Sequence, residues 1–184
     1  MMRITIITVF MFTLIGCSQS LKGIKKDESV ELQPEVGYLL IGLDTTLDLH
    51  TINITGANRF KFTKEDLRAG TNFILIDIPA GNYKISEIKF NRYSRLELVE
   101  GYWDFQVAPK KINYIGTLQV EGSSWFGWLN HVKVLLNNES TQAFTFIREN
   151  FPNLLNEYRI TFGGPGEDHF FEYLQSTEQQ LGGL

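Results

Sequence analysis

Residues 71–90 read TNFILIDIPAGNYKISEIKF, and the predicted fold class rests on them more than on any other part of the chain. Their first part, Thr71 to Ile78, is rich in Ile and Phe, which is typical of a β-strand. Pro79-Ala80-Gly81-Asn82 then predicts a turn, because proline fixes φ and glycine permits a positive φ. Tyr83 to Phe90 returns as a second strand, so the stretch predicts a β-hairpin.

The returning strand of this hairpin predicts one irregularity. Its apolar residues alternate up to Ile85 and start again, out of step, at Ile88. An extra residue in one strand of a pair shifts the alternation in this way. We therefore expect a β-bulge near Ser86 or Glu87.

A run upstream, Val36 to Leu43, has apolar residues on both faces of a strand. Every second residue from Leu39 to Leu43 lies on one face, and Tyr38 and Leu40 lie on the other. A strand with two apolar faces is buried on both sides. The run therefore predicts a central strand of its sheet.

Further strand patterns follow at intervals of about 8–12 residues, with glycine and proline between them. They are Leu49–Thr55, Arg59–Phe62, Tyr102–Val107, Ile112–Val120 and His131–Leu136. Within one of them, four residues are expected to share a face, namely Ile112, Tyr114, Leu118 and Val120. Many short strands at this spacing predict a mostly β protein with an antiparallel sandwich or barrel.

One short helix is predicted, in the C-terminal half of the chain. Apolar residues recur at helical spacing from Glu139 to Asn150, Asn138 suits the N-cap, and Pro152 limits the extension of the helix. We expect a single β-domain at residues 36–174, followed by a polar, frayed tail at residues 175–184.

Two segments resemble a known fold family. Residues 76–85, with Pro79, Gly81 and Tyr83, look like the P-x-G-x-Y turn of carboxypeptidase-regulatory-like and prealbumin-like sandwich domains. Residues 105–116 are similar to the continuation of such a domain in small bacterial lipoproteins of unassigned function. The resemblance implies a single Ig-like or prealbumin-like antiparallel β-sandwich. It supplies no catalytic residues.

The N-terminal residues resemble a bacterial lipoprotein signal peptide. Arg3 is followed by an apolar run to Ile15, and Leu14-Ile15-Gly16-Cys17 resembles a lipobox. The run suits a signal h-region of roughly 7–15 residues and is shorter than a membrane span of roughly 20. The resemblance implies that residues 1–16 are a signal peptide and that Cys17 carries a diacylglycerol. The alternative is a buried strand with a free thiol.

The residue after Cys17 bears on localisation. In the enterobacterial sorting rule, Asp at this position favours retention in the inner membrane, and here the position is Ser18. The resemblance therefore implies a cell-envelope protein, lipid-anchored in the outer membrane and facing the periplasm. A Gram-positive host would remove this inference.

Residues 17–35, from the lipidated cysteine onward, predict a flexible tether. They are rich in charged side chains and contain no aromatic residue. Such a segment cannot bury enough apolar surface to offset the entropy of ordering it. The alternative is a short edge strand around Val30 to Leu32. A tether would place the folded domain just off the membrane, which makes the membrane the first predicted partner.

Catalytic motifs are absent from the sequence, and we expect a non-enzymatic protein without cofactor or metal. There is no G-x-S-x-G, no H-E-x-x-H and no phosphate loop ending in Lys-Ser/Thr. Glu167-Asp168-His169 is an acid–histidine cluster, but adjacent strand residues point to opposite faces, which favours a solvated loop over a metal site. The formal net charge of −4 argues against a nucleic-acid partner.

The candidate binding residues are Trp125, Phe126 and Trp128, in a glycine-flanked loop between two predicted strands. Exposed aromatic side chains on a loop can stack on a sugar, dock a protein or lie at a membrane interface. The alternative is that a tryptophan folds back and caps the sandwich. We expect a membrane-anchored binding or structural module of the envelope. The alternatives are a glycan- or peptidoglycan-binding module and an accessory subunit of an envelope complex.

Overall fold

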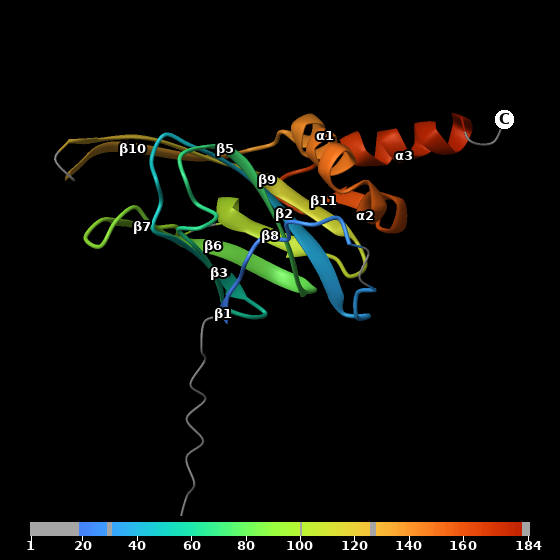
Figure 1. Ribbon diagram of the computed structural model, residues 1–184, viewed down its shortest axis with the longest axis horizontal. Coiled ribbons are helices and arrows are strands. Elements are labelled where there is room, and N and C mark those ends of the chain that lie inside the picture. Colours follow the sequence, from blue (N-terminus) through green and yellow to red (C-terminus); the bar gives the residue numbers. More distant parts are fainter. Residues whose placement is uncertain (1–18, 29–30, 100, 126–127, 182–184) are drawn as a thin grey trace, which may run out of the picture.

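The computed structural model describes residues 19–28, 31–99, 101–125 and 128–181. These residues form two β-sheets packed face to face, with helices over the outer face of one sheet (Figure 1). The predicted fold class, a mostly β two-sheet sandwich, is confirmed.

The first sheet contains β1 (Gln19–Ser20), β3 (Thr51–Gly56), β4 (Phe60–Thr63), β6 (Gly81–Lys89), β7 (Arg95–Glu97) and β8 (Asp104–Val107). Its order is β1-β4-β3-β6-β7, and β8 also pairs with β6. The second sheet contains β2 (Val36–Thr45), β5 (Gly70–Pro79), β9 (Ile112–Trp125), β10 (Trp128–Asn137) and β11 (Ile160–Phe162). Its order is β10-β9-β2-β5, and β11 also pairs with β9. The pairs β1–β4, β2–β9 and β9–β11 are parallel, which adds to the antiparallel pairing expected.

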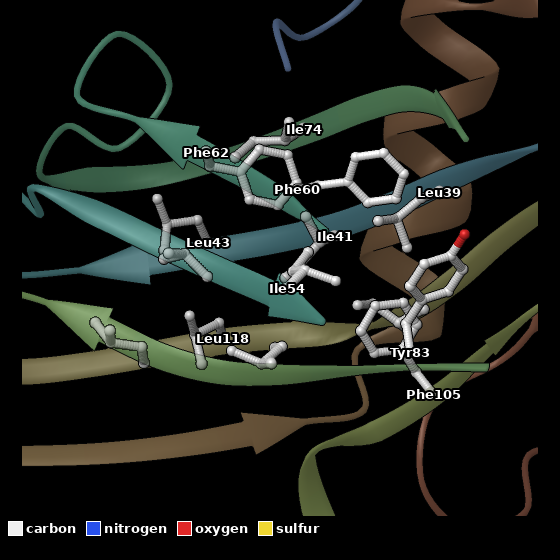
Figure 2. Packing of buried hydrophobic residues seen from close by; sticks show 14 of the residues in the cluster. Leu39, Ile41, Leu43, Ile54, Phe60, Phe62, Ile74, Tyr83, Phe105 and Leu118 are labelled. Atoms are coloured by element: carbon white, nitrogen blue, oxygen red, sulfur yellow. The ribbon is translucent and has the colours of Figure 1, made fainter. Parts of the chain in front are cut away.

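Strand β2 lies at the centre of the second sheet, between β9 and β5, as predicted. Its two apolar faces pack into two separate clusters of buried side chains. The intersheet cluster lies between the sheets (Figure 2) and includes Leu39, Ile41, Leu43, Ile54, Phe62, Ile74 and Tyr83. The helix-facing cluster lies between the second sheet and the helices and includes Tyr38, Leu40, Tyr114, Ile147, Leu154 and Phe171. The two apolar faces of β2 therefore correspond to two separate hydrophobic clusters, one on each side of the second sheet.

The predicted hairpin between residues 71–78 and 83–90 is wrong. Strand β5 pairs with β2 in the second sheet, whereas β6 pairs with β3, β7 and β8 in the first. The turn at Pro79 thus carries the chain from one sheet to the other. It is held there because the Ala80 amide donates to the Glu35 carbonyl at 2.7 Å and the Tyr83 hydroxyl donates to the Pro79 carbonyl at 2.8 Å.

The predicted bulge in β6 is confirmed. Asn53 of β3 is opposite Glu87, but the next residue, Ile54, is opposite Ile85, so Ser86 is the extra residue. The Ser86 hydroxyl donates to the Asn53 carbonyl at 3.1 Å. The bulge lets Ile85 and Ile88 both face the intersheet cluster despite their odd spacing.

A second bulge, in β9, overturns the prediction that four of its residues share a face. Ile112 and Tyr114 belong to the helix-facing cluster, but Leu118 and Val120 belong to the intersheet cluster. The register of β2 with β9 shifts by one residue just before Thr117. Gly116, in this irregular stretch, has φ +115°, a conformation that L side chains rarely adopt. The inward-facing side chains of β9 therefore pack into the helix-facing cluster before the bulge and into the intersheet cluster after it.

The predicted helix is present as α1 (Ser140–Asn150). Its N-cap is Glu139 and not Asn138 as predicted, although the Asn138 side chain, one residue earlier, accepts a hydrogen bond from the Ser140 amide at 3.1 Å. Pro152 starts a further short helix, α2 (Pro152–Glu157). The frayed tail expected at residues 175–184 is wrong for its described part, since α3 (Phe170–Leu181) runs through it. Phe171 anchors α3 in the helix-facing cluster. No helix of the described ranges is long and apolar enough to cross a membrane.

The N-terminal segment, residues 19–28 and 31–35, is packed on the domain, so the prediction of a flexible tether at residues 17–35 is wrong for its described part. Strand β1 pairs with β4, and the Leu21 amide donates to the Lys61 carbonyl at 3.2 Å. The Ile24 amide then donates to Leu75 of β5 at 2.7 Å. The segment thus lies along one edge of each sheet, β4 in the first and β5 in the second, and natural β-proteins protect such edges.

Polar contacts hold the rest of this segment. The Asp27 carboxylate accepts hydrogen bonds from the Asn153 and Leu154 amides, at 2.9 and 3.2 Å, at the start of α2. The Leu32 amide donates to the Tyr158 hydroxyl at 3.0 Å. Apolar contacts contribute as well, since Leu32 belongs to the helix-facing cluster, Ile24 packs against it and Leu21 packs against the intersheet cluster. Composition missed the docking because these few apolar residues are spread along a mostly polar segment and their partners lie far away in the sequence. The alternative of a strand around Val30 to Leu32 includes Val30, which lies outside the described residues.

Candidate functional site

The predicted aromatic segment is the tip of the β-hairpin made by β9 and β10. Trp125 ends β9, Trp128 begins β10, and the two residues are register partners. Phe126 lies outside the described residues, as do the side chains of Trp125 and Trp128. The loop between the two strands is shorter than predicted, because the strand pairing extends to both tryptophans. Whether their rings face solvent stays a prediction.

Beyond the sandwich, this hairpin continues as a two-stranded ribbon (Figure 1). The last pair between β9 and β2 is Val120 with Thr45, so the later residues of β9 pair with β10 alone. At the base of the ribbon, the Thr46 hydroxyl contacts both the Gly122 amide and its carbonyl, each at 2.9 Å. The β9–β10 ribbon, held at its base by Thr46, therefore places Trp125 and Trp128 away from the body of the sandwich.

An open groove of 710 Å³ lies at another place, where β6, β8 and the loop after β11 meet. Its lining residues are Thr55, Gly56, Asn82, Tyr83, Lys84, Asp104, Phe105, Gln106, Phe162, Gly163, Gly164 and Gly166. Tyr83 and Phe105 are stacked, with ring centroids 5.7 Å apart, and belong to the intersheet cluster. The groove therefore has a rigid aromatic base.

Two glycines bring the loop after β11 close to β8 and β9. A Cβ atom on Gly163 would lie 2.2 Å from the Gln106 carbonyl oxygen, and one on Gly164 would lie 2.4 Å from the Ile115 carbonyl oxygen. Backbone hydrogen bonds fix the approach, since the Gln106 amide donates to Gly163 at 2.7 Å and the Gly163 amide donates to Tyr114 at 2.8 Å. No larger residue fits at either position without displacing a strand.

The groove offers hydrogen-bonding groups of both kinds. Asn82 and Gln106 bring amide donors and acceptors, and Lys84 lies opposite Asp104 in the ladder of β6 and β8. Such a set suits a neutral, hydroxyl-rich ligand more than a charged one. Sequence reasoning missed this site. The signal in the sequence is the run Gly163-Gly164-Pro165-Gly166, whose glycines allow the close backbone approach.

The cluster Glu167-Asp168-His169 has a structural task. Asp168 Oδ1 accepts a hydrogen bond from the Phe170 amide at 2.8 Å and so caps α3. Its other oxygen accepts from Asn138 at 2.9 Å and from the Ser140 hydroxyl, which links α3 to the start of α1. Asp168 is thus committed to joining two helices.

The pKa values in this cluster follow from these contacts. Burial by itself raises the pKa of Asp168, but the hydrogen bonds from Ser140, Asn138 and the Phe170 amide outweigh it and lower the pKa below its usual value. The pKa of His169 is raised because its Nδ1 lies 2.9 Å from the Glu172 carboxylate. Both groups are stabilised in their charged forms at neutral pH.

The other two histidines of the sequence lie far from this cluster and from each other in the chain. His131 lies on β10 and is exposed, whereas His50 is half-buried beside β3. Within the described part of the chain, no group of three His, Cys, Asp or Glu side chains is arranged to hold a metal ion. Cys17 lies outside the described residues.

Comparison of the chain with protein-family models, with curated protein sequences and with solved structures finds no match to any of them.

Proposed function

We propose that this protein is a lipid-anchored protein of the bacterial envelope whose β-sandwich is a non-enzymatic binding or structural module. The observation that carries the proposal is the order of Arg3, the apolar run, Gly16 and Cys17 at the N-terminus. A diacylglycerol on Cys17, with further acylation, would hold the protein stably, because two or more acyl chains anchor firmly where one does not.

The packing of the N-terminal segment gives this anchor a consequence. Gln19, the first residue of β1, follows Cys17 after a single residue. An anchor at Cys17 would therefore hold the sandwich directly against the membrane surface, with no spacer between them.

The anchor is tested by growing cells with an alkyne analogue of palmitate and measuring label on the protein. We expect label on the native chain and none on Cys17→Ser, with Ser18→Ala as a matched control that keeps the label. Ser18→Asp should move the labelled protein from the outer to the inner membrane in an enterobacterial host. Label that persists in Cys17→Ser would contradict the proposal.

The non-enzymatic part rests on how the polar side chains are used. Asp168, the acid of the acid–histidine cluster, is the cap of α3, and Asp27 binds the amides at the start of α2. The proposal fails if the purified protein hydrolyses envelope polymers and replacing one acid or histidine abolishes that activity.

A second candidate function is glycan binding, favoured by the projection of the β9–β10 ribbon from the sandwich. Peptidoglycan fragments should quench tryptophan fluorescence, and the double variant Trp125→Ala/Trp128→Ala should lose that quenching. The polar groove is the competing site, for which Gln106→Ala is the matched variant. The absence of quenching at millimolar fragment would count against glycan binding.

A third candidate function is that of an accessory subunit. Crosslinking of the native envelope, followed by purification of the full-length protein and of Cys17→Ser in parallel, would recover a specific partner with the anchored form if the protein serves a complex.

A further inference from the structure

One end of the sandwich has a pair of adjoining cavities that the proposed function does not use. The larger has a volume of 480 Å³ and the smaller 280 Å³, and His50, Asn91 and Arg92 line both. The buried side chains of Leu49 and Phe90 contribute an apolar wall to the larger cavity.

Positive side chains dominate the lining of these two cavities. The cationic residues are Lys64, Arg68, Lys89, Arg92 and Arg95, and the acidic ones are Asp48 and Glu65. This is notable in a chain whose formal net charge is −4. How many of these cations can bind an external anion depends on which of them already pair with a carboxylate of the protein.

Two of the cations are neutralised within the first sheet. Lys89 lies 3.3 Å from the Glu87 carboxylate, and Arg95 lies 3.6 Å from Glu87 and 3.4 Å from Glu97. In contrast, the described part of the chain places no carboxylate within 4.0 Å of Lys64, Arg68 or Arg92. Three cations of the larger cavity therefore have no ionic partner among the described residues.

The acids beside the larger cavity are already engaged. Asp48 accepts a hydrogen bond from the Ala69 amide at 2.8 Å. Lys22 of the N-terminal segment lies 3.7 Å from Glu65, and Lys25 lies 3.3 Å from the neighbouring Asp66. The packed N-terminal segment thus supplies cations to the local acids, and Lys64, Arg68 and Arg92 stay available for an external anion.

The loop that carries Arg92 is held in place. The Asn91 side chain accepts hydrogen bonds from the Tyr93 and Ser94 amides at 2.8 and 2.7 Å. On the other side of the cavities, the His50 amide donates to the Lys89 carbonyl at 2.7 Å. A fixed loop reduces the entropy lost when a ligand binds.

We propose that this end of the sandwich binds a phosphate-bearing anion through Lys64, Arg68 and Arg92. Guanidinium groups match phosphate oxygens in a two-pronged geometry, and lysine adds a point charge. A volume of 480 Å³ lies within the range of about 300–1,000 Å³ for small-ligand sites, so it accepts a phosphoester larger than inorganic phosphate. The ligand is either a soluble phosphoester or the headgroup of an anionic phospholipid.

The test uses the full-length protein in a non-ionic detergent and follows thermal unfolding by tryptophan fluorescence. One arm adds pyrophosphate, with sodium chloride at equal ionic strength as its control. The other arm adds phosphatidylglycerol to the micelles, with phosphatidylcholine as its control. We expect Tm to rise by about 2–4 °C when the ligand exceeds its Kd about fivefold. The arm that responds identifies a soluble or a lipid source.

Variants separate this site from net charge. The double variant Arg68→Gln/Arg92→Gln should weaken the responding ligand at least tenfold, and Arg92→Gln alone should weaken it less. Both arginines are exposed, so neither change should lower Tm without ligand. Arg148→Gln, on α1, is the matched control and should keep the affinity. No rise in Tm in either arm, or an equal loss in Arg148→Gln, would overturn the proposal.

Discussion

The two faces of the second sheet are buried against different neighbours and are built differently. Toward the first sheet, β2 presents Leu39, Ile41 and Leu43 to an almost wholly hydrocarbon cluster. Toward the helices it presents Tyr38 and Leu40 to a cluster rich in tyrosine. One face relies on burial, which has no preferred direction, and the other adds hydrogen bonds, which do.

The tyrosine hydroxyls of the helix-facing cluster connect separate parts of the chain. The Tyr114 hydroxyl contacts the Thr117 hydroxyl at 2.9 Å and accepts from the Glu139 amide at 3.0 Å, just before α1. The Tyr158 hydroxyl accepts from the Leu32 amide in the N-terminal segment. The packing of apolar side chains thus joins the two sheets, whereas the directed hydrogen bonds of the tyrosine hydroxyls fix where the helices and the N-terminal segment lie.

The largest expected effect is on the intersheet face. Ile41→Ala should lower the free energy of unfolding by about 2–5 kcal/mol, because the side chain is 1% exposed and its removal leaves a cavity. Ile41→Val should cost only about 0.5–1.5 kcal/mol. Urea unfolding measures both. Equal losses in the two variants would break the view that volume alone matters on this face.

A smaller effect is expected on the helix-facing side. Tyr114→Phe leaves the Glu139 amide and the Thr117 hydroxyl without this partner, at a cost of about 1–3 kcal/mol. Amide exchange should speed up in α1 before it does in the strands. The matched control is Tyr83→Phe in the intersheet cluster, whose hydroxyl bonds the Pro79 carbonyl, and it should leave α1 protected. Uniform loss of protection in Tyr114→Phe would contradict the directed role of this hydroxyl.

Because Asp27 docks the N-terminal segment on α2, Asp27→Ala should lower the free energy of unfolding by about 1 kcal/mol. Asp27→Ala removes the acceptor for the Asn153 and Leu154 amides, in the manner of a lost helix cap. Urea unfolding should show the loss, and Glu28→Ala, whose described ion pair is the exposed one with Lys26, should show almost none. Equal stability of Asp27→Ala and the native chain would contradict the role of Asp27 in docking the segment on α2.

The titration of the buried tyrosines has no effect on stability at neutral pH and is expected to lower stability only in alkaline solution. Burial raises the pKa of Tyr38 to about 12, and burial also raises the pKa of Tyr114 and Tyr158. Above pH 10 the unfolded chain releases these protons before the folded chain does, so stability is full below pH 10 and falls from pH 10 to 12. Thermal unfolding at pH 8 and 11 checks this, and Tyr38→Phe should reduce the fall. A Tm that is flat over this range would contradict it.

Local patterns predicted what local residues determine. The two apolar faces of β2 and the extra residue at Ser86 both follow from side-chain alternation, and both are confirmed. The helix at residues 140–150 follows from helical spacing in the same way. Of the candidate binding residues, Trp125 and Trp128 were predicted in a loop, but the structure makes them the last residue of β9 and the first residue of β10.

The errors arise where partners distant in sequence decide. The turn at Pro79 is the same locally whether the next strand pairs with its predecessor or crosses to another sheet, and the Glu35 carbonyl settles the matter from far away. The shift before Thr117 follows a glycine that no alternation rule marks. The groove at Gly163 forms only when β3, β6, β8 and β11 have come together.

The docked N-terminal segment also has a mechanical consequence. A pull on the chain end would load its attachments one after another: first the Leu21 bond to β4, then the Ile24 bond to β5, then Asp27 at α2. Neither apolar cluster would bear the full load until these had opened. The N-terminal segment can thus detach and extend under tension while the sandwich stays folded.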